Sequence, residues 1–215
     1  MNTDIIECKV DKQGSGEIKR WYKNGKLHRD DGPAVITSNG AQHWYQNGEL
    51  HKDDGPALIC PYGSQHWYKH GLGHREDGPA VVTSGYEEWK INGKLHRVDG
   101  PAYKHYGYMD HEHWYFDGKL HRDDGPAVIQ GNYKSWYVHG ELHRLDGPAI
   151  QAKTTSYYYL LNERYNKDKF NKLLSLIRRF NNNLKRKYQV KVKNTIYNNT
   201  NICKDVCGLI SQYVI

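Results

Sequence analysis

The sequence predicts a mainly β protein, an elongated antiparallel array of β-hairpin repeats (a solenoid or long meander) with a small α-helical cap at the C-terminal end. Three observations lead to this prediction. A unit of roughly 23 residues recurs six times. Every copy carries the residues of a tight hairpin turn. From Asn166 onward the apolar residues change to helical spacing.

Composition favours a thin structure over a large globular core. Only 37% of the 215 residues are hydrophobic, and 18 Tyr and 6 Trp stand against 3 Phe and 2 Met. Such side chains combine an apolar face with a polar tip, so they suit two layers that stay partly in contact with water.

The repeat begins with a tryptophan and reads WYKNGKLHRDDGPAVI in its first copy. Successive copies start 22 to 25 residues apart, and all six tryptophans hold this first position: Trp21, Trp44, Trp67, Trp89, Trp114 and Trp136. We number the copies 1 to 6 in this order. One copy cannot bury its aromatic face alone, so neighbouring copies are expected to stack.

Each copy contains a two-residue turn. Asn, His or Asp stands before an invariant glycine, and these are residues that accept positive φ, as a type I′ turn requires. The glycines are Gly25, Gly48, Gly71, Gly93, Gly118 and Gly140. A leucine of the outgoing strand is expected to face the tryptophan layer as repeat core: Leu27, Leu50, Leu95, Leu120 and Leu142. Copy 3 has Gly73 there and is expected to pack more loosely. The Asp-Gly-Pro-Ala that follows predicts a second turn.

The repeats divide the chain into three segments. Residues 21–162 hold the six copies and a degenerate seventh, Tyr159 to Asn162. Residues 1–20 are predicted to form an N-terminal cap or degenerate half-repeat. Residues 163–215 form a helical segment that is strongly basic, since residues 163–205 contain 12 Lys/Arg and 3 Asp/Glu.

The WYxNGKLHRxDGPAxI unit resembles the MORN-like variant repeats of giant and iridescent-type DNA viruses and of phages, over about residues 15–162. The resemblance implies a β-hairpin repeat fold. It also implies protein contact, scaffolding, and virion or host-interaction roles. Phospholipid binding carries over poorly, because the closely spaced glycines of standard MORN units are missing.

A histidine and an aspartate recur in every copy, and we predict a structural role for them. A catalytic group appears once, whereas a residue needed in all copies usually serves packing or turn hydrogen bonding. We therefore predict no enzyme activity, no metal and no cofactor. The histidines are His28, His51, His74, His96, His121 and His143, and the aspartates three residues later are Asp31, Asp54, Asp77, Asp99, Asp124 and Asp146.

Positions that vary between copies are better candidates for recognition of a protein partner. One such row follows each Trp-Tyr pair or its equivalent: Lys23, Gln46, Lys69, Ile91, Phe116 and Val138. Aromatic inter-repeat loops such as Pro61-Tyr62-Gly63 are another. The chain is also expected to self-associate if strand edges stay exposed.

The C-terminal segment allows three interpretations. It is a helical cap on the last repeat, or an F-box-like end that binds a ubiquitin-ligase subunit, or a basic patch for nucleic acid or an anionic membrane surface. The F-box-like hypothesis rests on Ile202, Val206 and Ile210. The basic patch comprises Arg178, Arg179, Lys185, Arg186 and Lys187.

The sequence as a whole predicts a non-enzymatic repeat scaffold that mediates protein contacts, with the ubiquitin-ligase adaptor and the basic binding tail as alternatives. No signal peptide or apolar run of about 18 residues is seen. Four cysteines without a pairing pattern indicate reduced thiols. An intracellular protein of the host cytoplasm or of a virion is expected.

Overall fold

The computed structural model describes residues 6–13, 16–107, 109 and 111–191, with side chains of the C-terminal helix described as far as Asn182. The chain divides into two compact parts, Met1–Asn166 and Lys167–Ile215. The first part is the β-array, and the second contains α1 (Lys167–Lys191).

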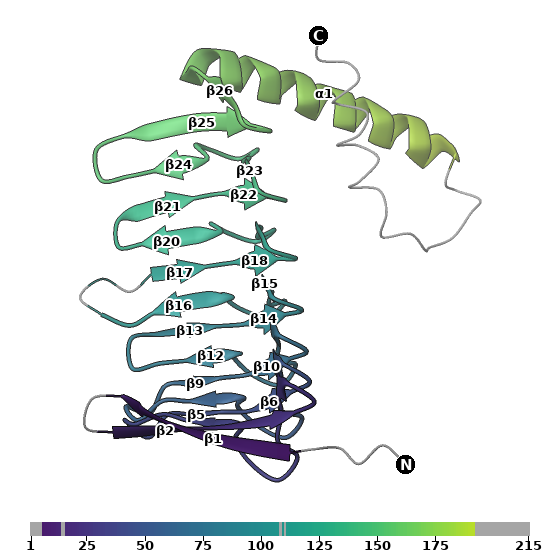
Figure 1. Cartoon of the computed structure of the whole chain (residues 1–215). Helices are drawn as coiled ribbons and strands as arrows, with labels where there is room; N and C mark the ends of the chain where they lie inside the picture. Colours follow the sequence, from purple (N-terminus) through teal and green to yellow (C-terminus); the bar gives the residue numbers. More distant parts are fainter. Residues whose placement is uncertain (1–5, 14–15, 108, 110, 192–215) are drawn as a thin grey trace. The chain divides into compact units, whose positions relative to one another are not determined.

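A sixteen-stranded antiparallel meander sheet runs the length of the β-array (Figure 1). Its strands follow one another in the order of the chain: β1 (Ile6–Gln13), β2 (Gly16–Lys23), β4 (Val35–Ile36), β5 (Gln42–His43), β8 (Leu58–Ile59), β9 (Gln65–His66), β12 (Val81–Val82), β13 (Tyr86–Glu88), β16 (Tyr103–His105), β17 (His111–His113), β20 (Val128–Gln130), β21 (Tyr133–Ser135), β24 (Ile150–Gln151), β25 (Ser156–Leu160) and β26 (Glu163–Tyr165), with β3 (Lys26–Leu27) paired to β2.

Five short hairpins form a second column beside this sheet (Figure 1). They belong to copies 2 to 6: β6 (Tyr45–Gln46) with β7 (Glu49–Leu50), β10 (Tyr68–Lys69) with β11 (Leu72–Gly73), β14 (Lys90–Ile91) with β15 (Lys94–Leu95), β18 (Tyr115–Phe116) with β19 (Lys119–Leu120), and β22 (Tyr137–Val138) with β23 (Glu141–Leu142). The repeat meander of the prediction is confirmed, and its N-terminal end is the β1–β2 hairpin.

The tryptophan of each copy lies where the main strand passes into its hairpin. In copy 2 the Trp44 N–H donates to the Ala57 carbonyl at 2.7 Å, and the Trp44 carbonyl accepts from the His51 N–H at 3.1 Å. The backbone of one tryptophan therefore ties the strand before the hairpin to the two segments after it.

The turn residues have the backbone that a type I′ turn requires. Asn24 has φ 51° and Gly25 has φ 75°, and both positions are positive in all six copies. After the last copy Leu161 (φ 49°) and Asn162 (φ 65°) adopt the same pair of conformations. Asn162 therefore takes the position of the glycine, and the turn ladder continues through the degenerate seventh copy.

A fully buried alanine recurs in every copy of the array. The alanine of each Asp-Gly-Pro-Ala turn is 0% exposed: Ala34, Ala57, Ala80, Ala102, Ala127 and Ala149. The tryptophans and leucines predicted as repeat core are only partly buried. The core is thus thin, with a small side chain under each tryptophan crossing and half-covered aromatic rings around it.

Gly73 of copy 3 does not leave a gap, contrary to the expectation of looser packing. A Cβ at Gly73 would lie 3.1 Å from Lys90 Cδ, so the aliphatic stem of this lysine fills the space that leucine takes elsewhere. Lys90 stands where five other copies carry tyrosine. The two substitutions therefore compensate each other across neighbouring copies.

The second part contributes one amphipathic helix. Asp168 lies in the first turn of α1, where a negative charge favours the helix N-terminus. Phe170 and Leu174, four residues apart on one face, are 1% and 8% exposed. The predicted C-terminal helix is confirmed, and its role as a cap stays a prediction.

The turn geometry gives a first test. Gly48→Ala should lower the free energy of unfolding by about 1–2 kcal/mol, because an L side chain is strained at φ 89°. Gly85→Ala is the matched control, since Gly85 has no positive φ and a Cβ placed on it would meet no heavy atom within 4 Å. Chemical denaturation measures both variants. Equal losses in the two variants would contradict the assigned turn.

Candidate functional site

An arginine clamp holds each loop onto its tryptophan. In copy 1 Arg29 Cζ lies 4.3 Å from the centroid of the Trp21 ring, and Nε donates to Asp31 Oδ1 at 2.8 Å. Nη1 reaches the Pro33 carbonyl at 3.5 Å. A Cβ at Gly32 would lie 3.1 Å from Arg29 Cζ, so glycine leaves room for the guanidinium between the ring and the loop.

The clamp recurs along the array. In copies 3 to 6 the guanidinium lies 3.7 to 4.1 Å from the tryptophan centroid, and Nε donates to the aspartate two residues later at 2.6 to 2.8 Å. The hydrogen bond from Arg75 lowers the pKa of Asp77 below its ordinary value. Copy 2 carries Lys52 instead, 4.3 Å from the Trp44 centroid.

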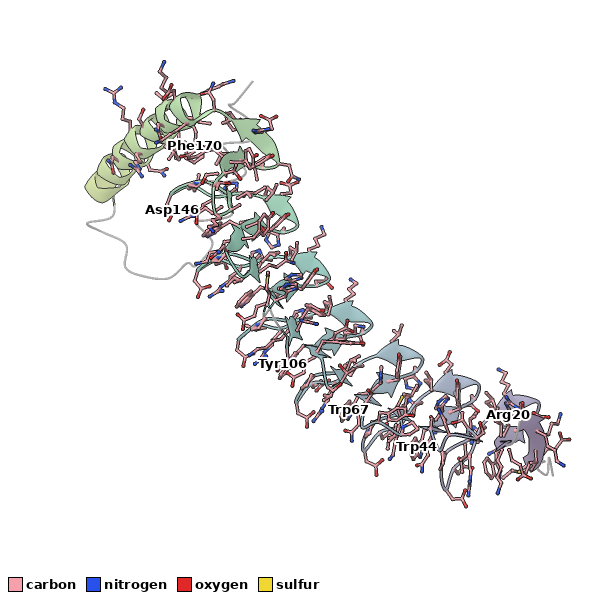
Figure 2. All side chains as sticks on the ribbon, turned by 90° about the vertical axis from the view of Figure 1, so that its left-hand side faces the viewer. Arg20, Trp44, Trp67, Tyr106, Asp146 and Phe170 are labelled. Atoms are coloured by element: carbon pink, nitrogen blue, oxygen red, sulfur yellow. The ribbon has the colours of Figure 1, made fainter. Side chains whose placement is uncertain are left out.

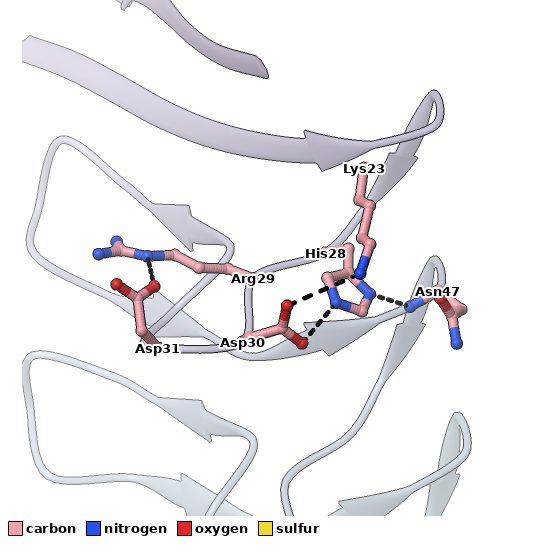
Figure 3. Close-up of polar contacts among 6 residues, drawn as sticks. All are labelled: Lys23, His28, Arg29, Asp30, Asp31 and Asn47. Atoms are coloured by element: carbon pink, nitrogen blue, oxygen red, sulfur yellow. Dashed lines mark hydrogen bonds and ion pairs between the residues drawn. The ribbon is translucent and has the colours of Figure 1, made fainter. Parts of the chain in front are cut away.

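The histidine of each copy binds the turn of the next. In copy 1 the Asn47 N–H of copy 2 donates to His28 Nδ1 at 3.0 Å (Figure 3). The same bond, at 3.0 to 3.3 Å, joins every further pair of neighbours: His70 to His51, Asn92 to His74, Asp117 to His96, His139 to His121 and Leu161 to His143. We call this series the imidazole ladder.

The ladder determines the tautomer of its histidines. Where Nδ1 accepts a backbone N–H, the proton of a neutral imidazole resides on Nε2. In copy 3 the Nδ1 of His74 also lies 3.0 Å from Asn92 Oδ1. In copy 1 Nε2 lies 2.8 Å from Asp30 Oδ1 (Figure 3). In copy 2 the Nε2 of His51 lies 3.2 Å from Asp53 Oδ1. A proton on Nδ1 would place two hydrogen-bond donors, the Nδ1–H and the backbone N–H of the next copy, against each other.

Backbone bonds complete the contact between copies. The glycine of each turn donates to the leucine-position carbonyl of the preceding copy, as Gly48 does to Leu27 at 2.8 Å. The residue after each ladder histidine donates to a carbonyl of the next copy, as Arg29 does to Tyr45 at 3.3 Å. The recurring histidines, and the arginines with the aspartates they bind, are thus occupied by contacts that build the array. Across the part of the chain that the structure describes, no group of three or more His, Cys, Asp or Glu could hold a metal ion.

The variable row lies on one face of the hairpins, which we call the hairpin face. Each row residue pairs with the first residue after the turn, as Ile91 does with Lys94, so both side chains of a pair share this face. Gln46, Lys69 and Phe116 are exposed, whereas Lys23, Ile91 and Val138 are half-buried. In copy 1 Lys23 Nζ lies 3.8 Å from Asp30 Oδ2 (Figure 3).

A groove between the loops of copies 2 and 3 was not predicted. Its volume is about 600 Å³, and it is lined by the Lys52–Gly55 loop, by Trp67 and Lys69, and by the His74–Asp77 loop. Figure 2 shows Trp44 and Trp67 in these successive copies. The sequence feature that could have indicated this groove is Lys52, because copy 2 is the one copy that carries lysine in place of the clamp arginine.

The predicted C-terminal sites are only partly described. Arg178 and Arg179 are exposed on α1. The backbone of residues 185–187 belongs to the same helix, but the side chains of Lys185, Arg186 and Lys187 lie outside the described part. Ile202, Val206 and Ile210 also lie outside the described residues.

Comparison with known proteins adds no relative. No family model, curated protein or solved structure matches the chain. Among the helices of the described residues, none is both long and apolar enough to cross a membrane.

The arginine clamp gives a second test. Gly78→Ala should cost about 1–3 kcal/mol of unfolding free energy, because the new Cβ would lie 2.7 Å from Arg75 Cζ and push the guanidinium off the ring. Gly55→Ala is the matched control, since its neighbour is the flexible Lys52 ammonium at 3.4 Å. If thermal denaturation gave equal losses of unfolding free energy for the two variants, the arginine clamp would not explain why position 78 is glycine.

Half-buried histidines give a third test, in acid. Burial lowers the pKa of His43, His66, His113 and His143 below the ordinary value of 6.5. The unfolded chain then binds protons at a higher pH than the folded chain. The free energy of unfolding should fall as pH decreases below about 6.5, and level off once the folded-state histidines are protonated.

The control for acid sensitivity replaces two histidines with the residue that another copy carries at the same position. Position 135, the equivalent of His113 and His66 before the tryptophan, is a buried serine. The H66S/H113S variant should show a smaller loss of melting temperature between pH 7 and pH 5 than the wild type. An unchanged loss would assign the acid sensitivity to other groups.

Proposed function

We propose that the chain is a non-enzymatic repeat scaffold that binds a protein partner through the hairpin face of its β-array. One observation carries the proposal. The residues shared by all copies are occupied by the arginine clamps and the imidazole ladder, whereas the residues that differ between copies stand on the hairpin face. Residues that the fold does not require are those available for selection by a partner.

The same reasoning argues against catalysis by the histidines and aspartates. Each ladder Nδ1 already accepts a backbone N–H, and the clamp aspartates are paired with arginines. A general base needs a lone pair directed at substrate. A ladder histidine has no such lone pair to offer while its copy is stacked on the next.

The resemblance to MORN-like variant repeats supports the proposal. Repeats of that kind serve protein contact and scaffolding, and the hairpin meander suits such a surface because it presents a row of side chains at regular spacing. We extend the proposal to the setting that the resemblance implies, a viral structural or host-interaction protein of the host cytoplasm or the virion.

The experiment is affinity capture from host-cell lysate with three forms of the protein: full length, residues 1–166, and full length with Q46K/F116K. Both substitutions introduce lysine, the residue that copies 1 and 3 carry in this row, so the fold should be retained. Partners of the array should be kept by residues 1–166 and depleted at least tenfold by Q46K/F116K. The control is Lys134→Gln, an exposed position on β21.

The alternatives predict different results in the same experiment. Ubiquitin-ligase subunits that are lost with residues 167–215 would favour the F-box-like adaptor. Retention of nucleic acid that falls steeply with salt would favour the basic tail. Either pattern, with no partner sensitive to Q46K/F116K, would overturn the hairpin face as the functional surface.

A further inference from the structure

Apolar side chains gather on the hairpin face of copies 4 to 6 and on the loops that follow these hairpins. Val98 is 82% exposed, and Phe116 and Leu145 are each 43% exposed. Ile91 and Val138, in the variable row, are half-buried. We call these five residues the apolar stripe. An exposed valine and phenylalanine near each other in a protein with only 37% hydrophobic residues call for an explanation.

The stripe replaces a set of polar pairs. In copy 1 the equivalents of Ile91 and Val98 are Lys23 and Asp30, an ion pair at 3.8 Å. Copies 2 and 3 likewise combine a polar row residue with an acid, Gln46 with Asp53 and Lys69 with Glu76. In copies 4 and 6 both members are apolar: Ile91 with Val98, and Val138 with Leu145.

These changes bring the fold no visible benefit. Asp30 accepts from the Nε2 of His28, whereas Val98 and Leu145 have no atom that can accept from His96 and His143. Copies 4 and 6 thus lack a hydrogen-bond acceptor for the ladder histidine and expose an apolar side chain instead. Contact with another apolar surface is the condition under which this exchange is favourable.

The stripe runs across the three copies, although copy 5 contributes only Phe116 and carries the exposed Asp123 at the position of Val98 and Leu145. The Phe116 ring lies 4.7 Å from the His96 ring of copy 4 and 6.0 Å from the His121 ring of its own copy. Each copy adds two strands to the main sheet, so equivalent side chains repeat every roughly 9–10 Å. The order along the stripe is an aliphatic pair, then Phe116, then a second aliphatic pair.

We propose that the apolar stripe is a docking surface for a second copy of this chain, packed antiparallel about a two-fold axis at Phe116. An aliphatic–aromatic–aliphatic order reads the same from both ends, as an isologous contact requires. A second array has the same spacing as the first. An extended strand of another protein would not match the stripe, because its side chains on one face repeat every roughly 6.6–6.8 Å.

Charge supports this direction of packing. Lys94 pairs with Ile91 on β14–β15, and Glu141 pairs with Val138 on β22–β23, so both lie on the hairpin face beside the stripe. Antiparallel packing brings copy 4 of one chain to copy 6 of the other and sets Lys94 against Glu141. In copy 5 Lys119 meets Lys119 of the other chain in either direction, so the outer copies decide the direction. Parallel packing would set like charges against each other. Lys94 also contacts Asp117 of its own chain at 2.8 Å.

The contact is small, because five side chains from each chain form its centre. An interface of this size belongs to the weak and transient class. The inference deepens the proposed function, since it names one partner for the hairpin face. A monomeric protein would overturn self-association and leave capture of another partner by residues 1–166 unaffected.

Sedimentation velocity of the full chain, from about 5 to 500 µM, tests the proposal. The wild type should show reversible dimerisation. V98D/L145D should weaken it at least tenfold, and the fold should survive because copies 1, 2 and 5 carry aspartate at this position. Tyr62→Ser, at a residue 91% exposed but outside the stripe, is the control and should dimerise like the wild type. A wild type that stays monomeric, or a V98D/L145D variant that dimerises unchanged, would overturn the proposal.

Cysteine pairing tests the direction, in a background with the four native cysteines changed to serine. Val98→Cys and Leu145→Cys chains should each stay largely uncrosslinked alone under mild oxidation. Their mixture should form a disulfide-linked dimer, because antiparallel packing brings position 98 of one chain to position 145 of the other. Efficient crosslinking of Val98→Cys with itself would instead show parallel packing and overturn the antiparallel arrangement.

Discussion

The hydrogen bond from the N–H of each hairpin turn to the histidine Nδ1 of the preceding copy is the contact on which the rest of the array depends. The strands of copies 2 to 6 are only two or three residues long. Such strands cannot form a stable sheet within one copy. In the hairpin column the imidazole ladder adds a side-chain bond to two backbone bonds at each junction, beside the strand pairing of the main sheet, and so fixes the position of each hairpin on the next.

The arginine clamp acts within a copy, and the ladder acts between copies. The clamp lays the Asp-Gly-Pro-Ala loop on the tryptophan ring, which brings the alanine under the tryptophan crossing, where it is 0% exposed. This arrangement orients the histidine, which precedes the clamp arginine directly. Because the two devices use residues of the shared motif, the fold constrains those positions and leaves the hairpin face free to vary.

Variation on the hairpin face divides the array into two halves. Copies 1 to 3 carry polar pairs such as Lys23 with Asp30, and copies 4 to 6 carry the apolar stripe around Phe116. The hairpin turns are the same in both halves, since every turn has the same pair of positive φ values. A uniform scaffold thus presents two chemically different surfaces along one face.

The sequence by itself determined the period, the turns and the mainly β class. These features depend on local chemistry: Asn24 and Gly25 accept positive φ wherever they occur, and a motif that recurs six times implies stacking. The terminal helix was predictable for the same reason, because helical spacing is a property of consecutive residues.

Only the tertiary structure decided which residues the stacking uses, and how. It places alanine rather than tryptophan out of contact with water, turns Nδ1 of His28 toward Asn47, and fills the space at Gly73 with Lys90. It also brings row residues next to loop residues seven positions later, which makes the apolar stripe visible. These contacts join residues of neighbouring copies or opposite ends of one loop, so they depend on how the strands pair and stack rather than on local preference.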